Sequence, residues 1–299
     1  MELKEQYFDF SPEELRRTQL KQLEMYGYFK DFCEKNGLTF FFCGGCCIGS
    51  LRHGGFIPWD DDIDVFMPRE DYEKLWRLWQ EREDNSRFEL LRTTPERFCG
   101  NIFMTLVDKN TTCVKPYQKE LDIPHGYPLD ILPLDGCPDG FKRKKQKIWA
   151  LLYSLFCAQV VPTNHGGAVG LAAKVLLGIF RGKKIRAKIW QACERNMTKY
   201  KIEDCEKITE LCSGPYYMKN EYPKQAFAGV VYKDFEGIPS PIPSGYDIYL
   251  KMAFGDYMTL PPKEKQKPHH DTVFSDIDAP CDTYRGIHFL TENKEGNPK

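Results

Sequence analysis

The chain has 299 residues, 41% of them hydrophobic, which is enough to bury the core of one large domain or two small ones. Its formal net charge of −1 provides no global basic field, so composition argues against a nucleic-acid-binding protein. The N-terminus is charged and lacks the apolar core of a signal peptide, and twelve cysteines are scattered without a disulfide-like framework. We therefore expect a protein of the reducing cytoplasm.

The first 80 residues alternate between predicted helices and strands. Ser11 and Glu14 form a capping box with proline at the first helical position, and apolar residues follow at helical spacing as far as Gly37. Residues 12–36 are therefore expected to form a long amphipathic helix. The pattern then predicts a short buried strand at 39–43, a turn and short helix at 44–53, a second strand at 62–67 and a helix at 69–80.

The rest of the chain predicts more strands and then a helical region. Strands are expected at 87–92, 101–107 and 127–132, and helices from 141 to about 202 with a break at 162–167. Beyond residue 208 the sequence has little periodicity. We expect an α+β fold, in which helices flank a mixed sheet, with a catalytic core at 1–140, a helical lobe at 141–205, and a segment at 206–299 that completes the catalytic domain.

A glycine pair followed by a run of aspartates indicates the chemistry. Gly44 and Gly45 end the first strand, where backbone N–H groups can approach a phosphate without interference from a Cβ. Asp62 and Asp64 lie on the second predicted strand, where alternation places both carboxylates on one face. Such a pair favours Mg²⁺ or Mn²⁺, and a metal-bridged phosphate beside a glycine turn is the geometry of phosphoryl transfer.

The same stretch has weaker alternative interpretations. Aspartate runs and glycine pairs also occur in exposed loops, but their order between two predicted strands favours an active site. Cys43 and Cys46 form a C-x-x-C, yet a zinc site needs a second pair of ligands, which the sequence does not offer at similar spacing. Asp60 and Asp61 are expected to be turn residues or to support the site, because alternation points Asp61 away from the face of Asp62.

The central motif resembles the signature of the LicD family, which comprises phosphocholine transferases of bacterial surface glycans and is related to fukutin. The residues that carry the resemblance are Gly44-Gly45, Gly49, Arg52-His53, Gly55, and the stretches 57–64, 67–72, 128–136, 242–250 and 254–262. The likeness spans about residues 20–270. It implies a nucleotidyltransferase-like fold.

The resemblance also implies a reaction. A CDP-alcohol, with CDP-choline favoured, would donate its phospho-alcohol to a sugar hydroxyl of a cell-surface glycan such as lipopolysaccharide or teichoic acid, releasing CMP. Asp62 and Asp64 would be the Mg²⁺ or Mn²⁺ pair, and a third carboxylate is expected on a neighbouring strand. Asp130 is the first choice for it, in an apolar-Asp-apolar strand setting, and Asp135 in an expected turn is the second.

Other candidate residues surround these carboxylates. Arg52 is expected to pair with a diphosphate, and His53 either orients a phosphate or binds the backbone of the next turn. Cys46 stands where the family usually has Thr or Ser, so its side chain is a poorer phosphate donor. A choline head group requires an aromatic wall. The candidates for it are Trp59 and Tyr257, with Tyr216, Tyr217 and Phe254 as further choices.

Several alternatives stay open at this point. The same core could attach a whole nucleoside monophosphate to a target, or belong to an inactive relative that binds glycans or a partner protein. The apolar segments 148–161 and 168–180 are too short to span a bilayer and are bracketed by basic clusters at 142–147 and 181–188. They are interpreted either as a peripheral docking surface for the inner membrane face, where lipid-linked acceptors of this type are built, or as a packed helical lobe.

Overall fold

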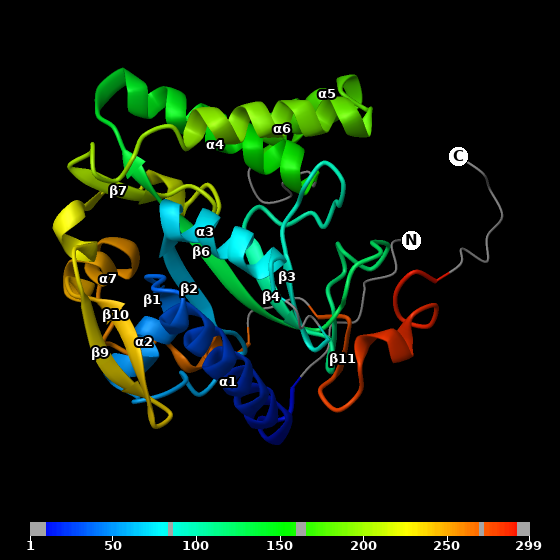
Figure 1. Cartoon of the computed structure of the whole chain (residues 1–299), viewed down its shortest axis with the longest axis vertical. Helices are drawn as coiled ribbons and strands as arrows, with labels where there is room; N and C mark the ends of the chain where they lie inside the picture. Colours follow the sequence, from blue (N-terminus) through cyan, green and yellow to red (C-terminus); the bar gives the residue numbers. More distant parts are fainter. Residues whose placement is uncertain (1–9, 83–85, 160–165, 269–271, 292–299) are drawn as a thin grey trace.

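The computed structural model (Figure 1) describes residues 10–82, 86–159, 166–268 and 272–291. A mixed sheet crosses the middle of the molecule, and helices pack around it (Figure 1). The strands of its main path follow the order β1 (Phe41–Phe42), β2 (Asp64–Pro68), β6 (Tyr127–Cys137), β4 (Met104–Asp108) and β3 (Phe88–Leu91). β2 and β6 are parallel, whereas their other neighbours run antiparallel. The expected α+β, nucleotidyltransferase-like architecture is confirmed.

Three helices of the N-terminal part lie close to their predicted bounds. They are α1 (Pro12–Lys35), α2 (Gly44–Arg52) and α3 (Arg69–Gln80). The capping box at the start of α1 is present, because the Glu14 N–H donates to Ser11 Oγ and the Ser11 N–H donates to Glu14 Oε2. α1 and α3 pack on the sheet, and α1 buries Tyr26 and Phe29 in the main core.

β6 is longer than the sequence predicts, and this changes the setting of Asp135. The prediction ends the strand at Leu132 and places Asp135 in a turn, but the strand continues to Cys137. The reason is a partner from far along the chain: β7 (Lys207–Glu210) pairs with β6 from Leu134 to Cys137 and continues the sheet to β8 (Tyr222–Pro223). Asp135 is therefore a buried strand residue.

The helical region forms a lobe with its own core at one end of the molecule's longest axis (Figure 1). It consists of α4 (Gly140–Ala158), α5 (Gly166–Ile179) and α6 (Lys183–Met197). Most of the predicted break at 162–167 lies outside the described residues, and α5 begins at Gly166. Tyr153, Leu177 and Trp190 lie in the lobe's core. Within the described residues, no helix combines the length and the apolar character needed to cross a membrane.

The last third of the chain contains regular elements that its irregular pattern concealed. β9 (Val230–Phe235) and β10 (Ile238–Pro243) form a hairpin, α7 (Tyr246–Phe254) follows it, and β11 (Phe274–Asp276) pairs with β5 (Thr112–Val114). Phe235 is fully buried, with its ring centroid 4.8 Å from those of Phe42 and Phe56. The C-terminal third thus shares one core with the N-terminal part.

Candidate active site

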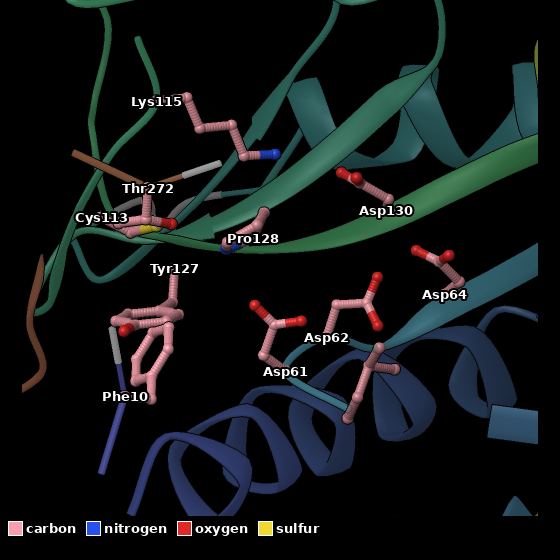
Figure 2. A pocket seen from close by; sticks show the side chains of 11 residues that line it. Phe10, Asp61, Asp62, Asp64, Cys113, Lys115, Tyr127, Pro128, Asp130 and Thr272 are labelled. Atoms are coloured by element: carbon pink, nitrogen blue, oxygen red, sulfur yellow. The ribbon is translucent and has the colours of Figure 1, made fainter. Parts of the chain in front are cut away.

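Two adjoining pockets share the three carboxylates Asp62, Asp64 and Asp130. The larger one, which we call the acidic cleft, opens between the start of α2, the beginning of β2, and the segments around Tyr217 and Phe254. The smaller one, drawn in Figure 2, lies on the side of Lys115 and Tyr127. The cleft is lined by Cys43, Gly44, Gly45, Asp60, Asp62, Asp64, Phe66, Ile102, Phe103, Asp130, Leu132, Glu210, Cys212, Ser213, Gly214, Tyr217, Tyr249 and Phe254.

The parallel pairing of β2 with β6 places two of these carboxylates side by side. Asp64 is the first residue of β2 and lies in register with Asp130 of β6. Asp62 precedes β2, because the strand begins two residues later than predicted, but its side chain still points into the same space (Figure 2). Ile63 between them is fully buried in the core. Carboxylate oxygens from two neighbouring strands form a donor set that suits a hard divalent cation.

The expected orientation of Asp61, pointing away from Asp62, is wrong. Its side chain lies beside that of Asp62 (Figure 2), and the carboxyl groups of Asp60, Asp61 and Asp62 have oxygens within 4.8 Å of one another. Strand alternation does not apply here, because the segment before Asp64 is irregular. Two glutamines of α1 hold this segment: the side-chain amide of Gln19 donates to the Asp60 carbonyl at 2.9 Å and that of Gln22 to the Asp61 carbonyl at 2.6 Å.

The glycine pair forms the first turn of α2 and lines the acidic cleft. Gly44 has a φ of +48°, in the left-handed region, and its N–H donates to the Tyr249 hydroxyl at 2.9 Å. A Cβ on Gly45 would lie 2.0 Å from Asp60 Oδ2, so a side chain there would displace this carboxylate. The N-terminus of α2 therefore faces the carboxylates, an arrangement that suits a bound phosphate.

Asp130 has a chain of supporting residues that the sequence does not indicate. The Thr105 hydroxyl donates to Asp130 Oδ1 at 2.8 Å, and the Asn101 side-chain amide donates to Thr105 Oγ1 at 3.0 Å. The Gln118 side chain in turn donates to Asn101 Oδ1 at 2.7 Å. Because β4 pairs with β6, Thr105 lies in register with Asp130. Only the pairing of β4 with β6 could have identified the contact between Thr105 and Asp130.

Lys115 is a second residue that the sequence reasoning missed. It follows β5, and its amine points toward Asp130 in Figure 2. Burial lowers the pKa of Lys115, but the Asp130 carboxylate and the Tyr117 hydroxyl together raise it well above its ordinary value. Lys115 is thus a fixed positive charge beside a cluster of carboxylates, where it can neutralise Asp130 or an anionic group of a substrate.

Asp135, the alternative third carboxylate, does not line the cleft. It is fully buried and receives two hydrogen bonds from Arg69, with Nε 2.8 Å from Oδ1 and Nη2 2.7 Å from Oδ2. Burial lowers the pKa of Arg69, but Asp135 outweighs it and holds that pKa well above its usual range. Between the two candidates, the structure brings Asp130 to Asp62 and Asp64 and gives Asp135 a different partner.

Arg52, His53 and Cys46 also lie away from the cleft lining. Arg52 and His53 are at the other end of α2, where the Arg52 guanidinium donates to the Tyr257 carbonyl at 2.9 Å and to His53 Nε2 at 3.0 Å. Cys46 is buried, with Sγ 3.8 Å from the Asp62 carbonyl oxygen, and burial with the nearby aspartates raises the pKa of its thiol. Their predicted phosphate contacts stay predictions.

The aromatic rings that line the acidic cleft do not include those of Trp59 and Tyr257, the first candidates for an aromatic wall. Trp59 is half-buried and packs on the main core, and the Tyr257 hydroxyl donates to Asp247 Oδ1 at 3.0 Å. Neither lines the cleft. The rings that do are those of Phe66, Phe103, Tyr217, Tyr249 and Phe254, of which the sequence analysis had named only Tyr217 and Phe254 as further choices.

A buried carboxyl group accompanies these rings. Glu210 is 3% exposed, lines the cleft, and accepts hydrogen bonds from the Asn220 amide at 3.2 Å and from the Tyr222 hydroxyl. Burial raises the pKa of Glu210 above its ordinary value despite these hydrogen bonds. The lining of the cleft therefore combines the aspartates with aromatic rings and one further carboxyl group.

Comparison with known proteins decides the family. Residues 37–117 match the model of the LicD/FKTN/FKRP nucleotidyltransferase domain. Over 263 residues the chain is 32% identical to the lipopolysaccharide cholinephosphotransferase LicD of Haemophilus influenzae, and the alignment covers 86% of this chain and 96% of that protein. The chain belongs to the LicD family. As a LicD-family protein it is a transferase enzyme.

A more distant relative shares part of this LicD-family chain. An uncharacterised protein of Rickettsia prowazekii is 29% identical over 114 residues, which is 35% of this chain and 43% of that protein. The region matched by the family model contains Gly44, Gly45, Asp62, Asp64 and Lys115, whereas Asp130, Glu210, Tyr217, Tyr249 and Phe254 lie beyond it.

Proposed function

We propose that this enzyme transfers phosphocholine from CDP-choline to a sugar hydroxyl of a cell-surface glycan and releases CMP. The observation that carries the proposal is the pairing of Asp64 with Asp130 in a cleft that also holds Asp62, the start of α2 and an aromatic wall. The similarity to a lipopolysaccharide cholinephosphotransferase over most of both chains supports the same reaction class. The identity of the donor and the release of CMP are part of the proposal.

The donor set of the cleft fits Mg²⁺, with Mn²⁺ as the alternative. Asp62, Asp64 and Asp130 would hold the ion, because their carboxylates line one cleft, Asp64 and Asp130 from neighbouring strands and Asp62 from the segment just before β2. When bound, such an ion neutralises the charge on the phosphates of the donor. Asp60 lies close enough to Asp62 to join them.

The chain's own residues bind and orient the reacting groups in this scheme. The first turn of α2 binds a phosphate oxygen of the donor, and Lys115 adds a positive charge on the side of Asp130. The acceptor hydroxyl attacks the phosphorus that carries the alcohol, the bond from this phosphorus to CMP breaks, and the hydroxyl proton passes to a carboxylate of the cleft. Asp130 is our choice for this carboxylate where Asp62 and Asp64 alone hold the ion. Thr105 positions this carboxylate through its hydrogen bond.

The aromatic wall favours choline as the alcohol. A quaternary ammonium group cannot donate a hydrogen bond, so it is recognised by aromatic faces and by negative charge. Tyr217 and Phe254 have ring centroids 5.9 Å apart, and Tyr249 lies 6.3 Å from Phe254. Glu210 supplies a carboxyl group on the same side of the cleft. The head group is therefore proposed to bind between these rings and Glu210.

A panel of donors tests the proposal. Purified enzyme with Mg²⁺ and a glycan acceptor fraction is supplied with CDP-choline, CDP-ethanolamine, CDP-glycerol or CDP-ribitol, and the release of CMP is measured. CDP-choline should be the preferred donor. Phe254→Ala should lower kcat/KM for CDP-choline alone, and so reduce the ratio of kcat/KM for CDP-choline to that for CDP-ethanolamine. Equal or better use of CDP-ethanolamine by the wild-type enzyme would contradict the head-group assignment. No CMP from any donor would favour an inactive binding protein.

A further inference from the structure

The helical lobe concentrates positive charge. Residues 140–193 contain eleven Lys and Arg residues and no Asp or Glu, although the net charge of the whole chain is −1. Arg143 and Lys147 pair with Glu221, and Arg186 binds the carbonyls of Leu177 and Phe180. The other cations are exposed and have no ion-pair partner among the residues that the structure describes: Lys142, Lys144, Lys145, Lys174, Arg181, Lys183, Lys184 and Lys188.

α5 in this lobe is apolar on two opposite faces. Ala173 and Leu177 are buried toward the lobe's interior. Leu171, Val175 and Ile179, spaced four residues apart on the other face, are 63%, 50% and 67% exposed. A helix that is apolar on all sides is normally covered on all sides, and scattered exposed residues do not form such a stripe. The stripe therefore indicates a surface that binds an apolar partner.

Exposed apolar side chains beside lysines also occur on the neighbouring helices of the lobe. Ile185 near the start of α6 is 52% exposed, and it lies in the sequence between Lys184 and Lys188. On α4, Phe141 and Ile148 are 71% and 57% exposed beside the lysines of that helix. Exposed apolar side chains and unpaired cations are thus intermixed on the lobe, which lies at one end of the molecule (Figure 1).

We propose that this lobe docks on a bilayer surface rich in anionic phospholipids. The α5 stripe would enter the boundary between head groups and acyl chains, and the lysines around it would contact the head groups. α5 has 14 residues, which is about 21 Å of helix and too short for the ~30 Å hydrocarbon core, so it lies in the plane of the surface. A second copy of the chain fits this face less well, because two such lobes would bring like charges together.

Docking of the lobe would keep the acidic cleft near the membrane. Ile102 and Phe103 line the cleft and also pack against the core of the lobe. An enzyme held by this lobe therefore has its cleft beside the docked lobe, on the side away from the α5 stripe. This consequence does not depend on the donor or the acceptor in the proposed function.

Vesicle sedimentation of the full-length protein tests the proposal. Vesicles of phosphatidylcholine alone are compared with vesicles that also contain phosphatidylglycerol, at low and at high salt. One variant, Lys174→Gln/Lys183→Gln/Lys184→Gln, removes charge from the surface. A second, Leu171→Ser/Val175→Ser/Ile179→Ser, removes the apolar stripe. The matched control, Lys263→Gln/Lys265→Gln/Lys267→Gln, removes three exposed lysines outside the lobe.

Wild-type protein should sediment with the anionic vesicles at low salt, remain in solution with neutral vesicles, and dissociate at high salt. A cation near an anionic surface contributes a factor of about five in partitioning, so the lobe's Lys variant should bind on the order of 100-fold more weakly. The stripe variant should also lose binding, and the control variant should retain it, all three with unchanged circular dichroism. Failure of the wild-type protein to bind anionic vesicles would overturn the proposal. A second result would also overturn it: a wild-type protein that is dimeric and a stripe variant that is monomeric but still binds vesicles normally. The stripe would then be a contact between protein copies.

Discussion

Asp64 and Asp130 lie opposite each other on the parallel strands β2 and β6, and this pairing joins two parts of the sequence into one site. Asp62 and Asp64 come from the motif that follows the glycine pair, whereas Asp130 lies more than sixty residues further along the chain. The register depends on the buried neighbours Ile63, Val65 and Ile131, because a shift by one residue would turn Asp64 or Asp130 into the core. The site is therefore fixed by the same packing that stabilises the sheet.

The proposed metal pair gives the first prediction. Asp64→Asn should lower kcat at least about 100-fold, because an amide cannot replace a charged ligand of a divalent cation. Stability should not fall, since removing one of several neighbouring carboxylates relieves repulsion in the metal-free protein. CMP release and the thermal midpoint are measured on the same preparation. Activity within about tenfold of wild type would rule out Asp64 as an essential ligand.

Asp135 provides a contrasting prediction. Asp135→Asn should destabilise the protein by about 3–5 kcal/mol, because it leaves the Arg69 guanidinium without its buried partner. The activity of the folded fraction should remain near that of wild type, since Asp135 does not line the cleft. Urea unfolding gives the free energy, and titrated active enzyme gives kcat. A stable but inactive variant would show that Asp135, and not only Asp130, takes part in the reaction.

The glycine pair offers a prediction with a matched control. Gly45→Ala should reduce activity, because its Cβ would lie 2.0 Å from Asp60 Oδ2 and would displace this carboxylate of the acidic cleft. Gly27→Ala, at a site in α1 where a Cβ meets nothing within 4 Å, should be tolerated and should stabilise the helix by up to about 1 kcal/mol. Kinetics and thermal unfolding of both variants separate the local clash from a general effect of losing glycine. Equal activity of the two variants would contradict the packing at Gly45.

Lys115 gives a prediction about pH. The pKa of Lys115 is raised well above its ordinary value, so the charged form persists throughout the neutral range. Because the pKa of Lys115 is higher in the folded than in the unfolded chain, its charge stabilises the fold fully below the unfolded pKa of about 10.4. This stabilisation is lost only as the pH rises further. Lys115→Met should therefore lower kcat/KM by a similar factor at about pH 6 and about pH 9, and Lys115→Arg should restore part of the loss. A defect that is present at about pH 6 but absent at about pH 9 would mean that Lys115 loses its charge in this range.

Local signals in the sequence account for the parts that were predicted well. The capping box at Ser11 and the helical spacing up to Gly37 gave α1, and the amphipathic pattern after Pro68 gave α3 with its observed bounds. The motif from Gly44 to Asp64 indicated the acidic site because it lies within one short stretch. Each of these features is set by residues that are neighbours along the chain.

The parts that could not be predicted depend on distant partners. Nothing near Asp135 shows that β7 will extend β6 and that Arg69 will bind this carboxylate. Asp61 was expected to point away because a strand was assumed where glutamines of α1 hold an irregular segment. Glu210 and Tyr249 reach the cleft only after the C-terminal third has packed on the sheet. Their roles become visible only in the folded chain.

The most direct test of the proposed reaction follows two labels at once. CDP-choline labelled separately in the choline methyl groups and in the cytidine is incubated with the enzyme, Mg²⁺ and a glycan fraction from the cells that make this protein. Phosphocholine transfer predicts that the choline label enters the glycan while the cytidine label appears as free CMP. Appearance of the cytidine label in the glycan would show nucleotidyl transfer and contradict the proposed function.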